Sequence, residues 1–184
     1  MKKIQKPGEG EYAPYASMYI DLLPDDGLVL QHLLDNLKLT KDLALSQSED
    51  RLTHRSAPAE WTIKEILAHI IDDERIYTYR ALRFARGDTT ELPGFDQDAY
   101  AAASGANERS IEDILEELTA VRMATIAFFH SLEEEVFTRS GVSNGHRMSV
   151  RAAVYHIAGH ELHHLKRYRK TIHQENDGMN QKRR

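Results

Sequence analysis

Two histidines in one short stretch, His160-Glu161-Leu162-His163-His164, have the spacing of paired metal ligands. Each residue of a helix turns the chain by about 100°, so His160 and His164 diverge by only roughly 40° and lie one turn apart. Two imidazoles placed in this way can bind the same divalent metal ion. Because zinc-like ions usually take three imidazole ligands and leave other positions open to water or substrate, a third histidine is needed from elsewhere in the chain.

The strongest candidate for the third ligand is His69, which lies in the stretch of residues 60–74. Thr62 and Glu65 match the S/T-x-x-E capping box that begins many helices, so His69 falls about two turns into a helix. On that helix His69 and Asp73 share a face with apolar side chains. A histidine and an aspartate on an otherwise apolar face need partners.

These two stretches resemble motifs of the DinB-like superfamily of four-helix metalloproteins. Residues 61–69 match the pattern W-[ST]-x-x-E-x-x-x-H at the entry to the family's second helix, and residues 156–164 are similar to its last helix. Residues 86–98 are also similar to the loop after the second helix in one branch of the family. The resemblance spans most of the chain and implies metal ligands at His69, His160 and His164.

The family includes thiol S-transferases and proteins described as metal-dependent hydrolases, so the resemblance implies a metal-dependent enzyme that acts on a small molecule. The cosubstrate of the transferases is bacillithiol, mycothiol or glutathione, and no residue here selects among these low-molecular-weight thiols. A divalent ion held by three neutral imidazoles keeps its full charge, so it can lower the pKa of water for hydrolysis or of a thiol for transfer. A homodimer paired through helix faces is also implied.

The metal and its role are open at the level of the sequence. An all-histidine site accepts several divalent ions, with zinc or nickel expected first and iron, manganese, cobalt or copper also acceptable. A non-catalytic metal-binding stress protein and a helical scaffold without metal are the alternative hypotheses. A closed site with His156 as fourth ligand would favour the first of these, although His156 and His163 are predicted to point outward.

The stretch from His160 to His164 also matches H-E-x-x-H, in which the glutamate of a zincin protease acts as general base. The twenty residues after His164 contain neither the extended H-E-x-x-H-x-x-G-x-x-H pattern nor a later glutamate-bearing helix, which argues against a protease. Glu161 and Asp73 are the candidate catalytic residues. Glu161 is alternatively expected to pair with Arg80 or another basic residue between helices, and Asp73 to support a ligand imidazole.

Four segments with helical periodicity are predicted to position these residues. They run from Asp25 or Asp26 to about Gln47, from Thr62 to Arg86, from Ser110 to Leu132 and from Val150 to Ile172, with Ser110 and Ser149 as caps. Residues 1–24 are expected to form an irregular arm, residues 88–109 a long loop, and residues 175–184 a flexible tail. The chain of 184 residues therefore predicts a single all-α domain, an up-down-type four-helix bundle with a long loop between its second and third helices. Trp61 is expected to anchor the entry of the second helix in the core.

Composition limits the classes of partner and site. A net charge of -5 and a pI near 6.1 argue against nucleic acid as a partner, because phosphate binding needs a dominant basic face. The absence of cysteine excludes disulfides and thiolate ligands, so a metal site has to use nitrogen and oxygen. No stretch approaches the ~20 apolar residues of a membrane span, and no apolar run follows Met1, so a cytoplasmic protein without a membrane partner is expected.

Overall fold

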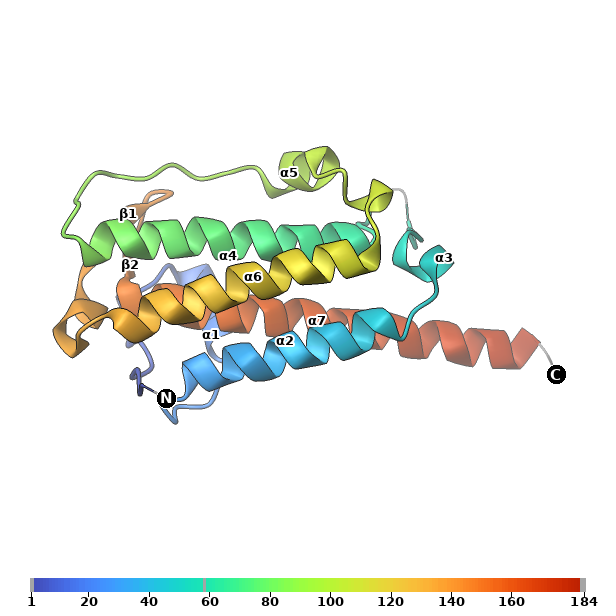
Figure 1. Ribbon diagram of the computed structural model, residues 1–184, viewed down its shortest axis with the longest axis horizontal. Helices are drawn as coiled ribbons and strands as arrows, with labels where there is room; N and C mark the ends of the chain where they lie inside the picture. The colour runs from blue at the N-terminus through green and yellow to red at the C-terminus, as the bar shows by residue number, and fades with distance from the viewer. Residues whose placement is uncertain (1, 58, 183–184) are drawn as a thin grey trace.

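The computed structural model of the protein describes residues 2–57 and 59–182, and the side chains of these residues up to residue 166. Four long helices form a bundle, and short elements connect them (Figure 1). The long helices are α2 (Val29–Leu45), α4 (Ile63–Ala85), α6 (Ile111–Ser131) and α7 (Val150–Lys182). The short elements are the 3-10 helices η1 (Pro14–Ala16), η2 (Ala106–Glu108) and η3 (Glu134–Thr138), the helices α1 (Ser17–Ile20), α3 (Glu49–Leu52) and α5 (Gln97–Ala103), and the strands β1 (Ser140–Ser143) and β2 (His146–Ser149). The predicted four-helix bundle is confirmed.

Local side-chain chemistry sets where the long helices begin. The hydroxyl of Thr62 accepts a hydrogen bond from the backbone N–H of Glu65, whose carboxylate accepts one from the N–H of Thr62 in return, so the predicted capping box is present. The hydroxyls of Ser110 and Ser149 accept backbone N–H groups at the starts of α6 and α7. These caps fix the residue at which each helix begins, and with it the side chains that the helix directs toward the core.

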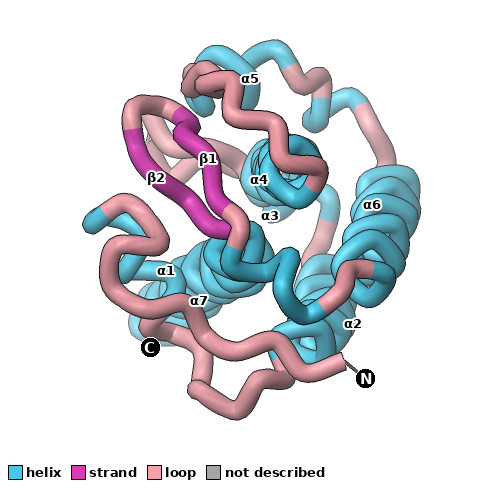
Figure 2. The backbone as a smooth tube through the Cα atoms, turned by 90° about the vertical axis from the view of Figure 1, so that its left-hand side faces the viewer, coloured by secondary structure: helices cyan, strands magenta, loops and turns pink. Residues whose placement is uncertain are grey.

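The four helices do not alternate in direction along the chain, which corrects the up-down order that the sequence predicted for the bundle. In Figure 1, α2 and α7 run one way and α4 and α6 the other. Glu74 of α4 contacts Arg122 of α6, and further along both helices Thr78 contacts Thr125. The residue numbers increase in the same direction on both helices, as they do only when two helices are parallel. The segment that links α4 to α6 therefore runs the whole length of the bundle. A short hairpin connection would have made these two helices antiparallel. Figure 2 views the bundle from its end, with α4 between α6 and α7.

The segment that makes this crossing is more ordered than the predicted loop of residues 88–109. It contains α5 and η2, and Asp96 caps α5 by accepting the backbone N–H groups of Asp98 and Ala99. Upstream, Leu92 forms an isolated bridge with Ser143 of the hairpin β1–β2. The hairpin turn at Asn144 and Gly145 has φ of 51° and 73°, the left-handed conformation that two-residue hairpin turns favour.

The amino-terminal arm is packed against the bundle, and residues 14–20 of it are helical where an irregular arm was expected. It contains η1 and α1, and the side chains of Ile4 and Ile20 are fully buried. The arm reaches α7 at Gly159, where a Cβ would lie 2.3 Å from the carbonyl oxygen of Tyr19. Glycine at position 159 thus lets the backbone of α1 contact α7 directly.

At the carboxyl end, α7 continues as helix to Lys182, so it includes most of the segment predicted as a flexible tail from residue 175. Residues 183–184 lie outside the described part of the chain. Of the helices in the described part, none combines the length and the hydropathy that spanning a lipid bilayer requires.

A buried ion cluster joins all four long helices in the middle of the bundle. The Arg122 guanidinium donates to the carboxylates of Glu74 and Glu161, each at 2.8 Å, and to the carbonyl oxygen of Leu33. The hydroxyl of Thr40 donates to the second oxygen of Glu161. The basic partner of Glu161 is therefore Arg122 and not Arg80, the residue that the sequence suggested by name.

Candidate metal centre

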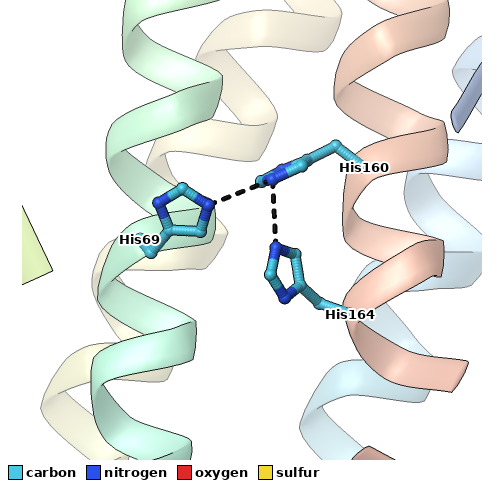
Figure 3. A group of neighbouring side chains, drawn as sticks. All are labelled: His69, His160 and His164. Atoms are coloured by element: carbon cyan, nitrogen blue, oxygen red, sulfur yellow. Dashed lines mark hydrogen bonds between the residues drawn. The ribbon is translucent and has the colours of Figure 1, made fainter. Parts of the chain in front are cut away.

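The structure brings the three predicted histidines together. Nε2 of His160 lies 3.0 Å from Nε2 of His69 and 3.0 Å from Nε2 of His164 (Figure 3). One nitrogen from each of the three rings falls within 4.8 Å of the others. Three imidazole nitrogens from two helices thus face a common point.

Two antiparallel helices position this cluster. His69 projects from the second turn of α4, which the capping box at Thr62 fixes in register. His160 and His164 are one turn apart on α7, which packs along α4. Because the ligand candidates lie 91 residues apart in sequence, the cluster exists only once the bundle has formed.

Burial keeps the three imidazoles neutral. It lowers the pKa of His160 to about 3 and that of His164 to about 2, because burial penalises the charged ring, and for the same reason it lowers the pKa of His69. A neutral imidazole has a lone pair on one ring nitrogen, which is the form that binds metals. The site therefore offers ligands at neutral pH without first releasing protons.

Asp73 lies behind the cluster, on α4. Its carboxylate is 3.3 Å from Nδ1 of His160 and 3.5 Å from Nε2 of His156. Burial alone would raise the pKa of Asp73, but the neighbouring imidazoles of His160 and His156 outweigh it and leave the pKa below its usual range. An ionised Asp73 favours a proton on Nδ1 of His160, so Nε2 keeps its lone pair toward the cluster.

This donor set fits a divalent metal ion. Nitrogens at 2.0–2.1 Å from one tetrahedral ion stand roughly 3.3 Å apart. The two spacings of 3.0 Å to His160 therefore need only a small adjustment, and the nitrogens of His69 and His164, which lie within 4.8 Å of each other, need to approach that distance. If Nε2 of His160 carries the lone pair, the N–H groups of His69 and His164 would have to share it as their only acceptor. A cation instead accepts a lone pair from each of the three nitrogens. Nδ1 of His69 is also buried without a hydrogen-bond partner in the described part of the chain. The arrangement is better matched to a cation than to a hydrogen-bond network.

Two further histidines of α7, His156 and His163, differ from their predicted outward orientation. His156 is buried, with its ring stacked on that of Tyr77 at 3.7 Å between centroids, and it is not among the ligand-distance group. His156 lies one turn before His160 on α7 and faces α4, where Tyr77 is located. His163 is half-buried, and its ring meets the edge of Tyr19.

Glu161 points away from the three histidines. Its carboxylate is held by Arg122 and Thr40 in the core, where burial raises its pKa. A zincin protease needs the glutamate of H-E-x-x-H beside the metal as general base. The structure therefore removes the basis for both the protease interpretation and a catalytic role of Glu161 at the cluster.

A cavity of about 420 Å³ lies against the exposed side of the histidine cluster. The ring of Trp61 forms part of its wall, with its centroid 4.7 Å from that of His69, and is only half-buried. Trp61 is thus a lining residue, whereas the sequence suggested a core anchor. Tyr19 is a second lining residue, which the sequence does not indicate because its position depends on the contact of α1 with Gly159. Asp98 of α5 and Glu60 place carboxylates in the same wall.

A second cavity, of about 250 Å³, also borders His160. Its walls come from η1, α1, α4, α7, the hairpin turn, and the start of α5 with the segment before it. Three residues border both cavities: Tyr19, Gln97 and His160. The two cavities therefore share the central histidine of the cluster as a wall residue.

Comparisons with known proteins agree with this geometry. The sequence profile of the DinB superfamily matches residues 29–166. A protein of Oceanobacillus iheyensis, named as an inferred metal-dependent hydrolase, is 28% identical over 123 residues, which cover 65% of this chain and 69% of that protein.

Two solved structures from Bacillus subtilis share the fold. YfiT, described as a probable metal-dependent hydrolase with an unusual four-helix bundle topology, matches with a TM-score of 0.69 at 16% identity and 88% coverage of each chain. The DinB-like protein YjoA matches with a TM-score of 0.53 at 19% identity and covers 79% of this chain and 91% of its own. At these identities the likeness establishes a common architecture.

Proposed function

The chain belongs to the DinB superfamily, as its motifs predict, and we propose that it is a metal-dependent enzyme that acts on a small molecule. One observation carries the proposal: three neutral imidazoles converge beside a cavity of about 420 Å³. His69, His160 and His164 would hold a divalent ion, with zinc or nickel as the first candidates. Open coordination positions would face the cavity, where a substrate can reach them.

The residues around the cluster have separate roles in this proposal. Asp73 orients the ring of His160 from behind, and Trp61 and Ile66 provide apolar walls that exclude water from part of the cavity. Asp98 and Glu60 are the lining carboxylates that can accept a proton at the cavity. When bound, the ion supplies Lewis acidity, which lowers the pKa of a water molecule or a thiol toward neutrality.

Hydrolysis is the reaction that the comparisons favour, because two of the matched proteins are described as metal-dependent hydrolases. Thiol S-transfer is the second candidate, and a different observation supports it. Two cavities, of about 420 and 250 Å³, both border His160, which gives room for two separate reactants. A transferase needs both a thiol and an electrophile at one centre, whereas hydrolysis needs one organic substrate.

Metal binding is tested first, by elemental analysis of protein purified without an affinity tag. We expect about one divalent ion per chain in the natural sequence and His163→Ala, and none in His160→Ala. His163 is a matched control, because it lies on the same helix and lines the cavity but is not in the histidine cluster. Equal metal content in His160→Ala and the natural sequence would contradict the proposal.

The reaction class is tested with the metal-loaded protein. A panel of esters, lactones and amides is assayed for hydrolysis, and bacillithiol, mycothiol and glutathione are each paired with an electrophile for transfer. Thiolate-to-cobalt charge-transfer bands in the cobalt form would support transfer. Turnover of a single substrate, without a thiol and lost in His160→Ala, would support hydrolysis. Metal binding without turnover in either panel would favour the non-catalytic stress protein.

A further inference from the structure

The second cavity contains a buried cation without a carboxylate partner. Arg80 of α4 lines this cavity with only 4% of its surface exposed. Among the side chains that the structure describes, no carboxylate oxygen lies within 4.0 Å of its guanidinium nitrogens. Its hydrogen bond goes to the carbonyl oxygen of Pro93 at 2.8 Å, and the residues one turn away on the helix are all non-acidic: Ile76, Tyr77, Arg83 and Phe84.

An unpaired buried arginine is unusual on energetic grounds. The guanidinium does not lose its proton in proteins, so its charge cannot be removed by a shift in pKa. Buried charges are normally paired, because removing an ion from water costs several kcal/mol, as an order of magnitude. The buried Arg122 in the same bundle follows this rule with two carboxylates, whereas Arg80 has a carbonyl and two aromatic rings.

We propose that Arg80 binds the carboxylate of a small organic acid in the second cavity. The fork of the guanidinium matches a carboxylate with two parallel hydrogen bonds, and the bond to Pro93 uses only part of its five donors. Arg80 is the only arginine among the lining residues, which include no lysine, so the site offers one positive charge to one negative group.

The walls of the cavity indicate the rest of the ligand. The guanidinium carbon of Arg80 lies 4.9 Å from the ring centroid of Tyr77 and 6.0 Å from that of Phe95, and Tyr15 adds a third ring to the lining. Aromatic walls suit a flat apolar body behind the carboxylate. The mouth is formed by exposed residues, Gly94, Gln97 and Asn144, so the ligand can enter from solvent.

The carboxylate of Asp73 also borders this cavity but does not compete for Arg80. The two residues are seven positions apart on α4, which is about 10 Å along the helix axis. Asp73 faces the imidazoles of His160 and His156, and its charge lies at the end of the cavity nearest the histidine cluster. An acid bound at Arg80 therefore has its charged end away from Asp73 and its body directed toward His160.

This inference rests on the proposed function in one respect: the acid becomes a substrate or product only if a metal is bound at the histidine cluster. The binding step itself does not need the metal and is tested on the metal-free protein. Benzoate is the probe, because it combines a carboxylate with a flat ring, and benzamide is its neutral counterpart. The nitrogen-proton NMR signal of the Arg80 Nε–H group, assigned by its loss in Arg80→Met, reports the contact.

We expect benzoate to shift this signal saturably and benzamide to leave it unchanged. Arg80→Met should weaken benzoate binding, followed by calorimetry, at least about tenfold, whereas Arg83→Met should not, because Arg83 pairs with Asp88 outside both cavities. Equal shifts with both probes, no saturable shift with benzoate, or a larger effect of inorganic phosphate would each overturn the proposal.

The comparison of benzoate with benzamide uses the natural sequence, so it stands even if Arg80→Met does not fold. The two proposals also fail separately. Loss of metal in His160→Ala with no benzoate binding would refute only the Arg80 site. Benzoate binding in a protein that takes up no metal would refute only the metal-dependent function.

Discussion

The carboxylate of Asp73 lies 3.3 Å from Nδ1 of His160, while Nε2 of the same ring faces His69 at 3.0 Å. Nδ1 of the imidazole thus faces an acid, and Nε2 faces the other histidines of the cluster. This arrangement is common where a histidine binds a metal, because the acid fixes the tautomer and raises the basicity of the ligand nitrogen. Asp73 is therefore a positioning residue. Its effect on metal affinity can be separated from that of negative charge alone by comparison with Asp72.

Asp73→Asn should weaken zinc affinity by about 10–100-fold, because the amide no longer holds the proton on Nδ1 of His160. Asp72→Asn is the matched control, since Asp72 is adjacent in sequence, only half-buried and near Arg75. Competition with a zinc-binding dye measures both affinities. The same loss in both variants would mean that negative charge near the site, and not the orientation of His160, sets the affinity.

The metal-free protein should lose stability as the pH falls from about 6.5 toward 3. His160 and His164 have folded-state pKa values of about 3 and about 2 against a reference of 6.5, so the unfolded chain binds more protons in this window. The free energy of unfolding should therefore decrease by up to about 1.4 kcal/mol per pH unit for each of these histidines. Urea denaturation with a chelator present measures it, and His130→Ala, which removes an exposed histidine, should not alter the slope. A stability independent of pH in this range would show that the rings are not held neutral.

Arg122→Met should destabilise the protein by about 3–5 kcal/mol, because it leaves the carboxylates of Glu74 and Glu161 buried without a cation. Arg75→Met removes an exposed ion pair with Glu117 on the same pair of helices and should cost no more than about 1 kcal/mol. Urea denaturation of both variants gives the comparison. Similar losses would indicate that the buried cluster contributes no more than a surface pair.

Gly159→Ala should displace α1, because the added Cβ would lie 2.3 Å from the carbonyl oxygen of Tyr19. We expect a loss of about 1–3 kcal/mol in the free energy of unfolding, as for other overpacked sites. Gly8→Ala is the control, since its Cβ would meet nothing closer than 3.6 Å. If Gly159→Ala is as stable as Gly8→Ala, the close approach of α1 to α7 is not required by the fold.

The single tryptophan should report metal binding directly. The ring centroid of Trp61 lies 4.7 Å from that of His69, so copper or nickel at the cluster should quench its fluorescence. Titration with Cu²⁺ should reach an end point near one ion per chain, and the response should be absent in His160→Ala. Quenching of equal strength in that variant would place the copper elsewhere.

The features that the sequence predicts well are those with a local cause. Thr62 with Glu65 and the hydroxyl of Ser110 start helices through contacts three residues apart, and the spacing of His160 and His164 follows from the helix itself. The family motif then linked these two histidines to His69. Such features depend on side chains a turn apart, which a sequence shows directly.

The features that it could not predict depend on contacts between distant segments. The short helix α1 has four residues and is held by Gly159, more than a hundred residues away, so its own sequence carries little signal. Arg122 lies on α6, and the parallel arrangement of α4 and α6 brings it to Glu74, while the packing of α7 brings Glu161 to the same guanidinium. The direction of α6 depends in turn on a crossing segment whose path no periodicity encodes.

That crossing segment borders both cavities but contributes no residue to the histidine cluster. The long helices supply the imidazoles and the acid behind them, whereas Gln97 and Asp98 of the crossing segment border the larger cavity, and Gly94, Phe95 and Gln97 border the smaller one. Substitution of these few residues would reshape both cavities, while the four long helices and the histidine cluster stay the same. If the proposed function holds, substitutions in this surface segment would alter which substrate fits, while the interior of the bundle stays unchanged.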